Sequence, residues 1–231
     1  MLHMAPIALA VVDMAGTTVR EEGLVERAFL TALGSLGVPL RPDLDERFRR
    51  SRGGSKLAMF AAALGGDMHR ATAAHEAFER AVIAAAERGE ITPLAGAGAA
   101  LLELRTMGVK VSLTTGFSRP VRDAVIDRLG WTSLVDLVLS PEDAGRGRPH
   151  PDLILTAVLR LEVDDVRQLA VVGDTANDLI AGTRAGASIV AGVLTGAHGR
   201  DELAAAPHTH LIEGIAQFPA IVRSAVSGGE R

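Results

Sequence analysis

The chain contains no cysteine and no tyrosine, and aromatic residues make up only 3% of its 231 residues. Without cysteine it can form no disulfide and use no thiolate as a nucleophile or metal ligand, which agrees with a cytoplasmic protein. No apolar run approaches the roughly 18 residues that a membrane-spanning helix needs. The N-terminal M-L-H-M-A-P also lacks the basic region and cleavage site of a signal peptide. We therefore expect a cytoplasmic location and no membrane partner.

Lysine is scarce as well, and the chain is not basic overall. The formal net charge is −4, which gives no indication of a nucleic-acid partner. Of 24 basic residues, only Lys56 and Lys110 are lysines. Where arginine is used almost everywhere, a remaining lysine is a better candidate for amine chemistry.

The sequence does contain short apolar runs that alternate with helical patterns. Apolar runs typical of buried strands lie at 7–12, 109–113, 134–139, 169–172 and 189–194. Helical patterns lie between them at about 99–107, 120–129, 152–161 and 176–185, the third with Pro151 in its first turn. This alternation predicts an α/β fold with a doubly wound, mostly parallel sheet.

A long helical block separates the first strand from the others. Residues from about 21 to 88 show four helical stretches: one that ends at Gly34 and Gly37, one at 42–50, one that starts at Lys56 with Ser55 as its cap, and one at 71–88. This block is too long for a crossover connection. It predicts an inserted helical cap of residues 19–91, a catalytic core of residues 1–18 and 92–225, and a tail of residues 226–231.

Four polar motifs follow the predicted strands or the loops beside them. Asp13 ends the first strand, and taken alone it is best explained as a turn residue. The other motifs favour a functional role, because all four can meet at the carboxyl edge of the sheet, where open α/β sheets bind ligands. They are Asp13-Met14-Ala15-Gly16-Thr17-Thr18, Thr114-Thr115-Gly116, Gly147-Arg148-Pro149-His150-Pro151-Asp152 and Gly173-Asp174-Thr175-Ala176-Asn177-Asp178.

The acidic residues of these motifs suit phosphoryl transfer. Attack by the carboxylate of Asp13 on a phosphoryl group would form an aspartyl-phosphate, which water then hydrolyses. A divalent cation has to offset the repulsion between two anions, and oxygen ligands favour Mg²⁺. Asp13, Asp174 and Asp178 supply such ligands, although for Asp178 a role in orienting a ligand is favoured over binding the metal itself.

The remaining motif residues suit the phosphoryl group. The hydroxyl of Thr115 and the backbone N–H of Gly116 can hold its oxygens. Arg148 can stabilise charge on the transferring group, an effect that dominates this type of catalysis.

These motifs together resemble those of the haloacid dehalogenase superfamily, with a helical cap inserted after the first motif. Most phosphatases of that superfamily have a second Asp where this chain has Ala15, and many have Lys where it has Arg148. Both features, and the run from Thr114 to Phe117, are similar to the phosphonatase-like group. The resemblance implies metal ligands at Asp13, Ala15, Asp174 and Asp178.

The same resemblance implies a role for Lys56. In phosphonatases a cap lysine forms a Schiff base with the aldehyde substrate, and Lys56 is the one lysine in the predicted cap. Three positions depart from the phosphonatase pattern: Met14 replaces Trp, Met59 replaces the His three residues after the lysine, and Phe117 replaces Tyr. A surface lysine at the start of a helix is an equal alternative for Lys56.

The substrate stays open at this stage. Candidate substrate contacts are Met14, Gly54, Ser55 and Phe117, in addition to Thr115 and Gly116. We expect a Mg²⁺-dependent hydrolase of a small phosphorylated or phosphonated metabolite. A phosphonoacetaldehyde hydrolase with a Lys56 Schiff base and a phospho-ligand-binding protein with little turnover are the alternatives.

Two further expectations concern surfaces. The resemblance implies a homodimer formed through the cap. Five histidines without metal-ligand spacing are expected on the surface: His69, His75, His198, His208 and His210.

Overall fold

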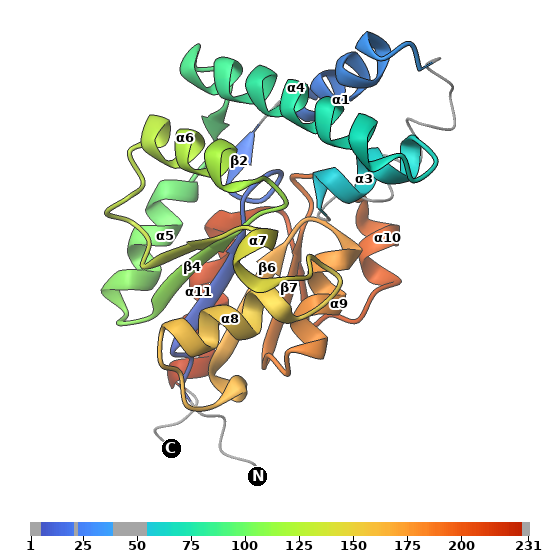
Figure 1. The fold of residues 1–231 in the computed structure, drawn as a ribbon. Helices are drawn as coiled ribbons and strands as arrows, with labels where there is room; N and C mark the ends of the chain where they lie inside the picture. The colour runs from blue at the N-terminus through green and yellow to red at the C-terminus, as the bar shows by residue number, and fades with distance from the viewer. Residues whose placement is uncertain (1–5, 21–22, 39–54, 228–231) are drawn as a thin grey trace.

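The central element is a six-stranded parallel sheet in the order β5-β4-β1-β6-β7-β8 (Figure 1). The structure is a computed structural model that describes residues 6–20, 23–38 and 55–227. The parallel pairing and order of these strands confirm the predicted α/β class with a doubly wound, mostly parallel sheet. The strands are β1 (Leu9–Asp13), β4 (Lys110–Thr114), β5 (Leu137–Leu139), β6 (Leu169–Gly173), β7 (Ile189–Val193) and β8 (His210–Ile212).

Helices cover both faces of this sheet, and the alternation of side chains along β1 shows why. Leu9 and Val11 pack into one buried cluster with residues of α8 (Asp152–Arg160) and α9 (Ala176–Arg184). Ala10 and Val12 pack into the other, with residues of α5 (Ala97–Thr106), α6 (Arg119–Leu129) and α11 (Phe218–Ser227). Because neighbouring residues of a strand point to opposite faces, a strand covered on both sides is apolar at every position.

Short elements complete this part of the chain. They are α7 (Pro141–Ala144), α10 (Arg200–Ala204) and the 3-10 helices η1 (Val166–Gln168) and η2 (Ile215–Gln217). At the start of α7 the backbone N–H of Ser140 donates to Oδ2 of Asp143 at 2.8 Å, and the backbone N–H of Asp143 donates to the carbonyl oxygen of Ser140 at 2.9 Å.

A helical insertion leaves the sheet after β1 and returns before α5. Its two ends pair as antiparallel strands, β2 (Val19–Arg20) and β3 (Thr92–Pro93). Between them lie α1 (Leu24–Ser35), α3 (Lys56–Ala63) and α4 (Met68–Glu87), which cross one end of the sheet (Figure 1). Phe60 holds these helices together: its ring centroid lies 4.4 Å from that of Phe29 and 5.9 Å from that of Phe78.

Some local expectations are met and others need correction. Helix α1 ends at Ser35, one residue after Gly34, and Gly37, with a φ of 72°, follows the helix as expected. Ser55 is the N-cap residue of α3, but its side chain makes no capping hydrogen bond. Pro151 is the N-cap residue of α8 rather than part of its first turn. The short strand expected within 134–139 is present as β5.

Two predicted segments lie wholly or partly outside the described residues. The helix predicted at 42–50 lies outside the described residues, and so does the end of the tail from residue 228. None of the helices in the described part of the chain has the length and apolar character to cross a membrane.

Candidate active site

The carboxyl ends of β1, β4 and β6 bring the polar motifs together. Asp13 is the last residue of β1 and lies opposite Thr114, the last residue of β4. On the other side β6 ends at Gly173, directly before Asp174. The strand order runs outward in both directions from β1, so these ends flank the point where such sheets bind their ligands.

A tight turn fixes the backbone after Asp13. The carbonyl oxygen of Met14 accepts hydrogen bonds from the N–H groups of Thr17, Thr18 and Val19 at 3.2, 2.8 and 2.9 Å. Gly16 has a φ of 88°, and a Cβ there would lie 2.4 Å from Oδ2 of Asp174. The turn therefore needs glycine both for its backbone conformation and for the space that Asp174 occupies.

Arg148 is held between two carboxylates. Its Nη1 donates to Oδ1 of Asp13 at 2.5 Å and to Oδ1 of Asp178. The side chains of all three residues are at least 95% buried. Nε of Arg148 has no hydrogen-bond partner among the described residues. A buried guanidinium between two acids is fixed in position, and it retains donor capacity for a ligand.

Asp174 and Asp178 come from the turn that starts α9. Oδ2 of Asp174 accepts a hydrogen bond from the N–H of Ala197 at 2.7 Å. Thr175 is the N-cap of α9 and forms a capping box with Asp178, whose Oδ2 accepts from the Thr175 N–H at 3.1 Å and from its hydroxyl at 2.5 Å. Asp13, Asp174 and Asp178 each offer an oxygen atom, and these atoms all lie within 4.8 Å of one another. The buried trio is compatible with metal binding.

The electrostatics of the site follow from its burial. Burial raises the pKa of Asp13 to about 6, and the negative charge of Asp178 adds to the rise while Arg148 opposes it. Burial and the charges of Asp13 and Asp178 raise the pKa of Asp174 well above its usual range. Burial opposes the charge on Arg148, but the two carboxylates outweigh it and raise the pKa of Arg148. Three buried carboxyl groups therefore share one buried arginine.

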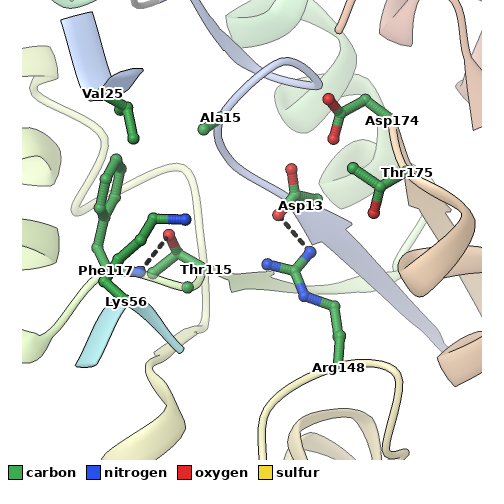
Figure 2. A pocket seen from close by; sticks show the side chains of 10 residues that line it. Asp13, Ala15, Val25, Lys56, Thr115, Phe117, Arg148, Asp174 and Thr175 are labelled. Atoms are coloured by element: carbon green, nitrogen blue, oxygen red, sulfur yellow. Dashed lines mark hydrogen bonds and ion pairs between the residues drawn. The ribbon is translucent and has the colours of Figure 1, made fainter. Parts of the chain in front are cut away.

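These groups face a small cavity of about 30 Å³, which we call the inner cavity. Thr115 and Gly116 line it from the loop after β4, and Oγ1 of Thr115 accepts a hydrogen bond from the N–H of Phe117 at 3.1 Å. Lys56 enters from α3 and is only 6% exposed. Figure 2 shows its side chain pointing toward the loop that carries Asp13 and Ala15. The surface-lysine alternative for Lys56 is therefore wrong.

Most of the predicted site residues meet at the inner cavity. Its lining includes Asp13, Ala15, Lys56, Thr115, Gly116, Phe117, Arg148 and Asp174. Asp178 lies behind Arg148, and Ser55 lines a neighbouring cavity. Met14 is fully buried and does not line the inner cavity, so its contact with substrate stays a prediction. Gly54 lies outside the described residues.

The sequence interpretation missed other residues at the site. Thr175 and Val25 also line the inner cavity. The spacing from Thr175 to Asp178 is a recognisable capping box, whereas Val25 reaches the site through tertiary packing of α1 and carries no local signal. His75 is wrongly placed on the surface, because its side chain is 15% exposed and packs against Phe60 and Phe78.

Comparisons with known proteins agree with this geometry. Residues 7–186 match a family model described as haloacid dehalogenase-like hydrolase. The chain is 32% identical over 204 residues to the probable phosphatase IndB of Dickeya dadantii, a match that covers 86% of each chain. It is 32% identical to the phosphonoacetaldehyde hydrolase of Bacillus cereus (strain G9842) over 106 residues, 46% of this chain and 40% of that one. The crystal structure of a phosphonoacetaldehyde hydrolase-like protein from Oleispira antarctica superposes with a TM-score of 0.81 at 20% identity, covering 98% of this chain and 95% of that one.

Proposed function

The chain belongs to the haloacid dehalogenase-like hydrolases, and on that premise we propose that it hydrolyses a small phosphate or phosphonate through an aspartyl-phosphate on Asp13. The observation that carries this proposal is the inner cavity. Asp13, Arg148 and Thr115 line it together, and its volume of about 30 Å³ suits a single transferring group rather than a whole metabolite.

The chain's own residues can perform both halves of this reaction. A carboxylate oxygen of Asp13 attacks phosphorus and the bond to the leaving group breaks, so the phosphoryl group is transferred to Asp13. The Thr115 hydroxyl and the Gly116 N–H hold phosphoryl oxygens, and Arg148 offsets their charge. Water then attacks phosphorus, which releases phosphate and restores the Asp13 carboxylate.

The acidic trio fits a Mg²⁺ ion. Asp13 and Asp174 are buried with raised pKa values, and Arg148 alone does not balance them. A divalent cation held by these carboxylates and the carbonyl oxygen of Ala15 would lower the repulsion between Asp13 and an anionic phosphoryl group. Asp178 completes the trio either as a ligand or by positioning Arg148.

Ala15 raises the question of the leaving group. It offers no side-chain acid to protonate a departing alkoxide, so this part of the site favours leaving groups that depart without being protonated. Acyl phosphates meet that requirement. A phosphonate meets it too, if the electron pair of the broken carbon–phosphorus bond has an acceptor.

Lys56 favours a second candidate, the hydrolysis of phosphonoacetaldehyde. Its amine lies in the cavity that Asp13 lines, where it could condense with the aldehyde and release water. Asp13 would then attack phosphorus, and the electron pair of the carbon–phosphorus bond would pass to the iminium to give an enamine. Protonation and hydrolysis of the enamine would release acetaldehyde and free Lys56.

We extend the proposal to the helical insertion. Residues 19–91 would act as a cap over a core of residues 1–18 and 92–225, with 226–231 as a tail. The β2–β3 pair supports this division because it brings the two ends of the insertion side by side. A homodimer formed through this cap is part of the proposal, and a light-scattering mass near the monomer's 24.1 kDa would contradict it.

The test is phosphate release in the presence of Mg²⁺, with phosphonoacetaldehyde, acetyl phosphate and a panel of phosphate monoesters as substrates. Asp13→Asn should abolish release from every substrate that the wild type hydrolyses. If phosphonoacetaldehyde is the substrate, Lys56→Ala should lower its turnover at least about a thousandfold and spare acetyl phosphate.

A matched control and a chemical trap complete this design. Lys110→Ala removes the other lysine, which lies exposed on β4, and should leave all rates unchanged. Borohydride added with phosphonoacetaldehyde should attach a two-carbon unit to Lys56 alone. Turnover that survives Asp13→Asn would overturn the aspartyl-phosphate, and binding without turnover would favour a phospho-ligand-binding protein.

A further inference from the structure

A second cavity adjoins the inner cavity. It has a volume of about 220 Å³ and we call it the outer cavity. Lys56 and Gly116 line both cavities. A molecule whose phosphoryl group lies at Asp13 therefore has space for its remainder on the far side of these two residues.

Ser118 contributes an unused hydrogen-bonding group to the outer cavity. It is the N-cap residue of α6, yet its side chain does not cap the helix, and its Oγ has no partner among the described residues. The residue is 93% buried. Buried hydroxyls are normally paired, and Ser118 lines the outer cavity, so an oxygen of a bound molecule could satisfy it.

His75 adds a second polar group from α4. Its ring centroid lies 6.2 Å from that of Phe60 and 6.3 Å from that of Phe78, and its Nδ1 lies 3.8 Å from Oε1 of Glu79. Burial lowers the pKa of His75, against the effects of Glu79 and Glu142, which favours the neutral ring. A neutral imidazole offers one donor and one acceptor to an uncharged polar group.

Charge decides which molecules fit this cavity. Lys56 points toward the Asp13 loop (Figure 2), so its charge serves the phosphoryl side. Lys56 and the α7 residue Glu142 both line the outer cavity, and of these two Glu142 carries the negative charge. A leaving group with its own carboxylate would be placed near this glutamate and repelled.

We infer that the outer cavity binds the leaving group and selects for one that is uncharged and carries a hydroxyl or carbonyl oxygen. Ser118 and His75 hydrogen-bond this oxygen, and Glu142 disfavours carboxylates. The inference rests on the proposed function, because it assumes that Asp13 receives the phosphoryl group. It makes Ser118, His75 and Glu142 specificity-determining residues that touch the part of the substrate that leaves.

Two compounds of nearly the same shape test this selection. Glycerol 3-phosphate ends in a hydroxymethyl group where 3-phosphoglycerate ends in a carboxylate. Each is measured as a competitive inhibitor of acetyl phosphate hydrolysis, and its dissociation constant is measured by calorimetry with Mg²⁺ present. We expect the wild type to bind glycerol 3-phosphate at least about tenfold more tightly than 3-phosphoglycerate.

Variants separate the contributions. Ser118→Ala should weaken the binding of glycerol 3-phosphate about three- to tenfold, the effect of one lost hydrogen bond. Glu142→Gln, at an exposed position, should strengthen the binding of 3-phosphoglycerate severalfold. His75→Phe should weaken the binding of glycerol 3-phosphate to a similar extent as Ser118→Ala. Ser224→Ala, exposed on α11, is the control and should change nothing.

The outcomes distinguish the two proposals. If the wild type hydrolyses no phosphate or phosphonate, the proposed function fails, and calorimetry still reports whether the outer cavity selects uncharged groups. If acetyl phosphate is hydrolysed but 3-phosphoglycerate binds as tightly as glycerol 3-phosphate, the selection is overturned. The same holds if Ser118→Ala and Glu142→Gln leave both affinities unchanged.

Discussion

Asp13→Asn should stabilise the metal-free protein, and the gain should grow with pH. Burial raises the pKa of Asp13 from its ordinary value of 3.8 to about 6 in spite of the ion pair with Arg148. A carboxyl whose pKa is raised on folding favours the folded state most below pH 3.8. That contribution is lost as the pH rises through 6.

The size of the effect follows from this pKa. A change of one pKa unit corresponds to about 1.36 kcal/mol. Ionisation of Asp13 therefore lowers the free energy of unfolding by about 3 kcal/mol at pH 8 and by roughly half of that at pH 5. Asparagine has nearly the same shape and carries no charge at either pH. In a chain of this length, about 3 kcal/mol corresponds to a rise in Tm of roughly 6–12 °C.

Urea denaturation in the presence of EDTA provides the assay. Trp131 is the only tryptophan in the chain and is 4% exposed, so its fluorescence reports unfolding. Asp164→Asn, at an exposed loop position, is the control and should show no gain that depends on pH. If Asp13→Asn destabilises the protein more at pH 8 than at pH 5, the ion pair with Arg148 outweighs burial and the reasoning is wrong.

Two further predictions concern the support of this site. Gly196→Ala should destabilise the protein by about 1–3 kcal/mol and remove any stabilisation by Mg²⁺ in a thermal melt, because its Cβ would lie 2.0 Å from Oδ2 of Asp174. A Cβ on Gly199 would have no atom within 4 Å, so Gly199→Ala should change neither the stability nor the effect of Mg²⁺. Equal effects of the two substitutions would contradict this account. Thr175→Val should lower the free energy of unfolding by about 1 kcal/mol through loss of the N-cap of α9, measured by urea denaturation, whereas Thr175→Ser should retain it.

The sequence predicted the sheet well because burial on both faces leaves a simple pattern. β1, with Ala10 and Val12 facing one cluster and Leu9 and Val11 facing the other, is apolar until Asp13. The carboxyl ends of parallel strands lie at one edge by topology alone. A strand that ends in a polar residue therefore indicates the site without any knowledge of distances.

Tertiary packing explains what the sequence did not reveal. His75 looks like a surface residue in a helix with many exposed neighbours, and its burial depends on Phe60, 15 positions earlier in another helix. Ser118 has the sequence position of a helix cap, and only the structure shows that its hydroxyl makes no such bond. The polar walls of the outer cavity come from α3, α4, α6 and α7, and no periodicity along the chain connects these elements.

The structure also bears on the alternative left open for Asp178. Its Oδ2 accepts from Thr175 and its Oδ1 accepts from Arg148, so both oxygens already have protein partners. In Asp174 the hydrogen bond from the N–H of Ala197 engages Oδ2 alone. Among the described residues, the carboxylate of Asp178 thus accepts three hydrogen bonds from protein donors and that of Asp174 accepts one, so Asp174 has more acceptor capacity left for a metal. This difference favours Asp178 as the residue that positions Arg148 and the first turn of α9, and Asp174 with Asp13 as the metal ligands. The closeness of Asp178 to the strand end agrees with this role, because a Cβ on Gly173 would lie 2.3 Å from Cγ of Asp178.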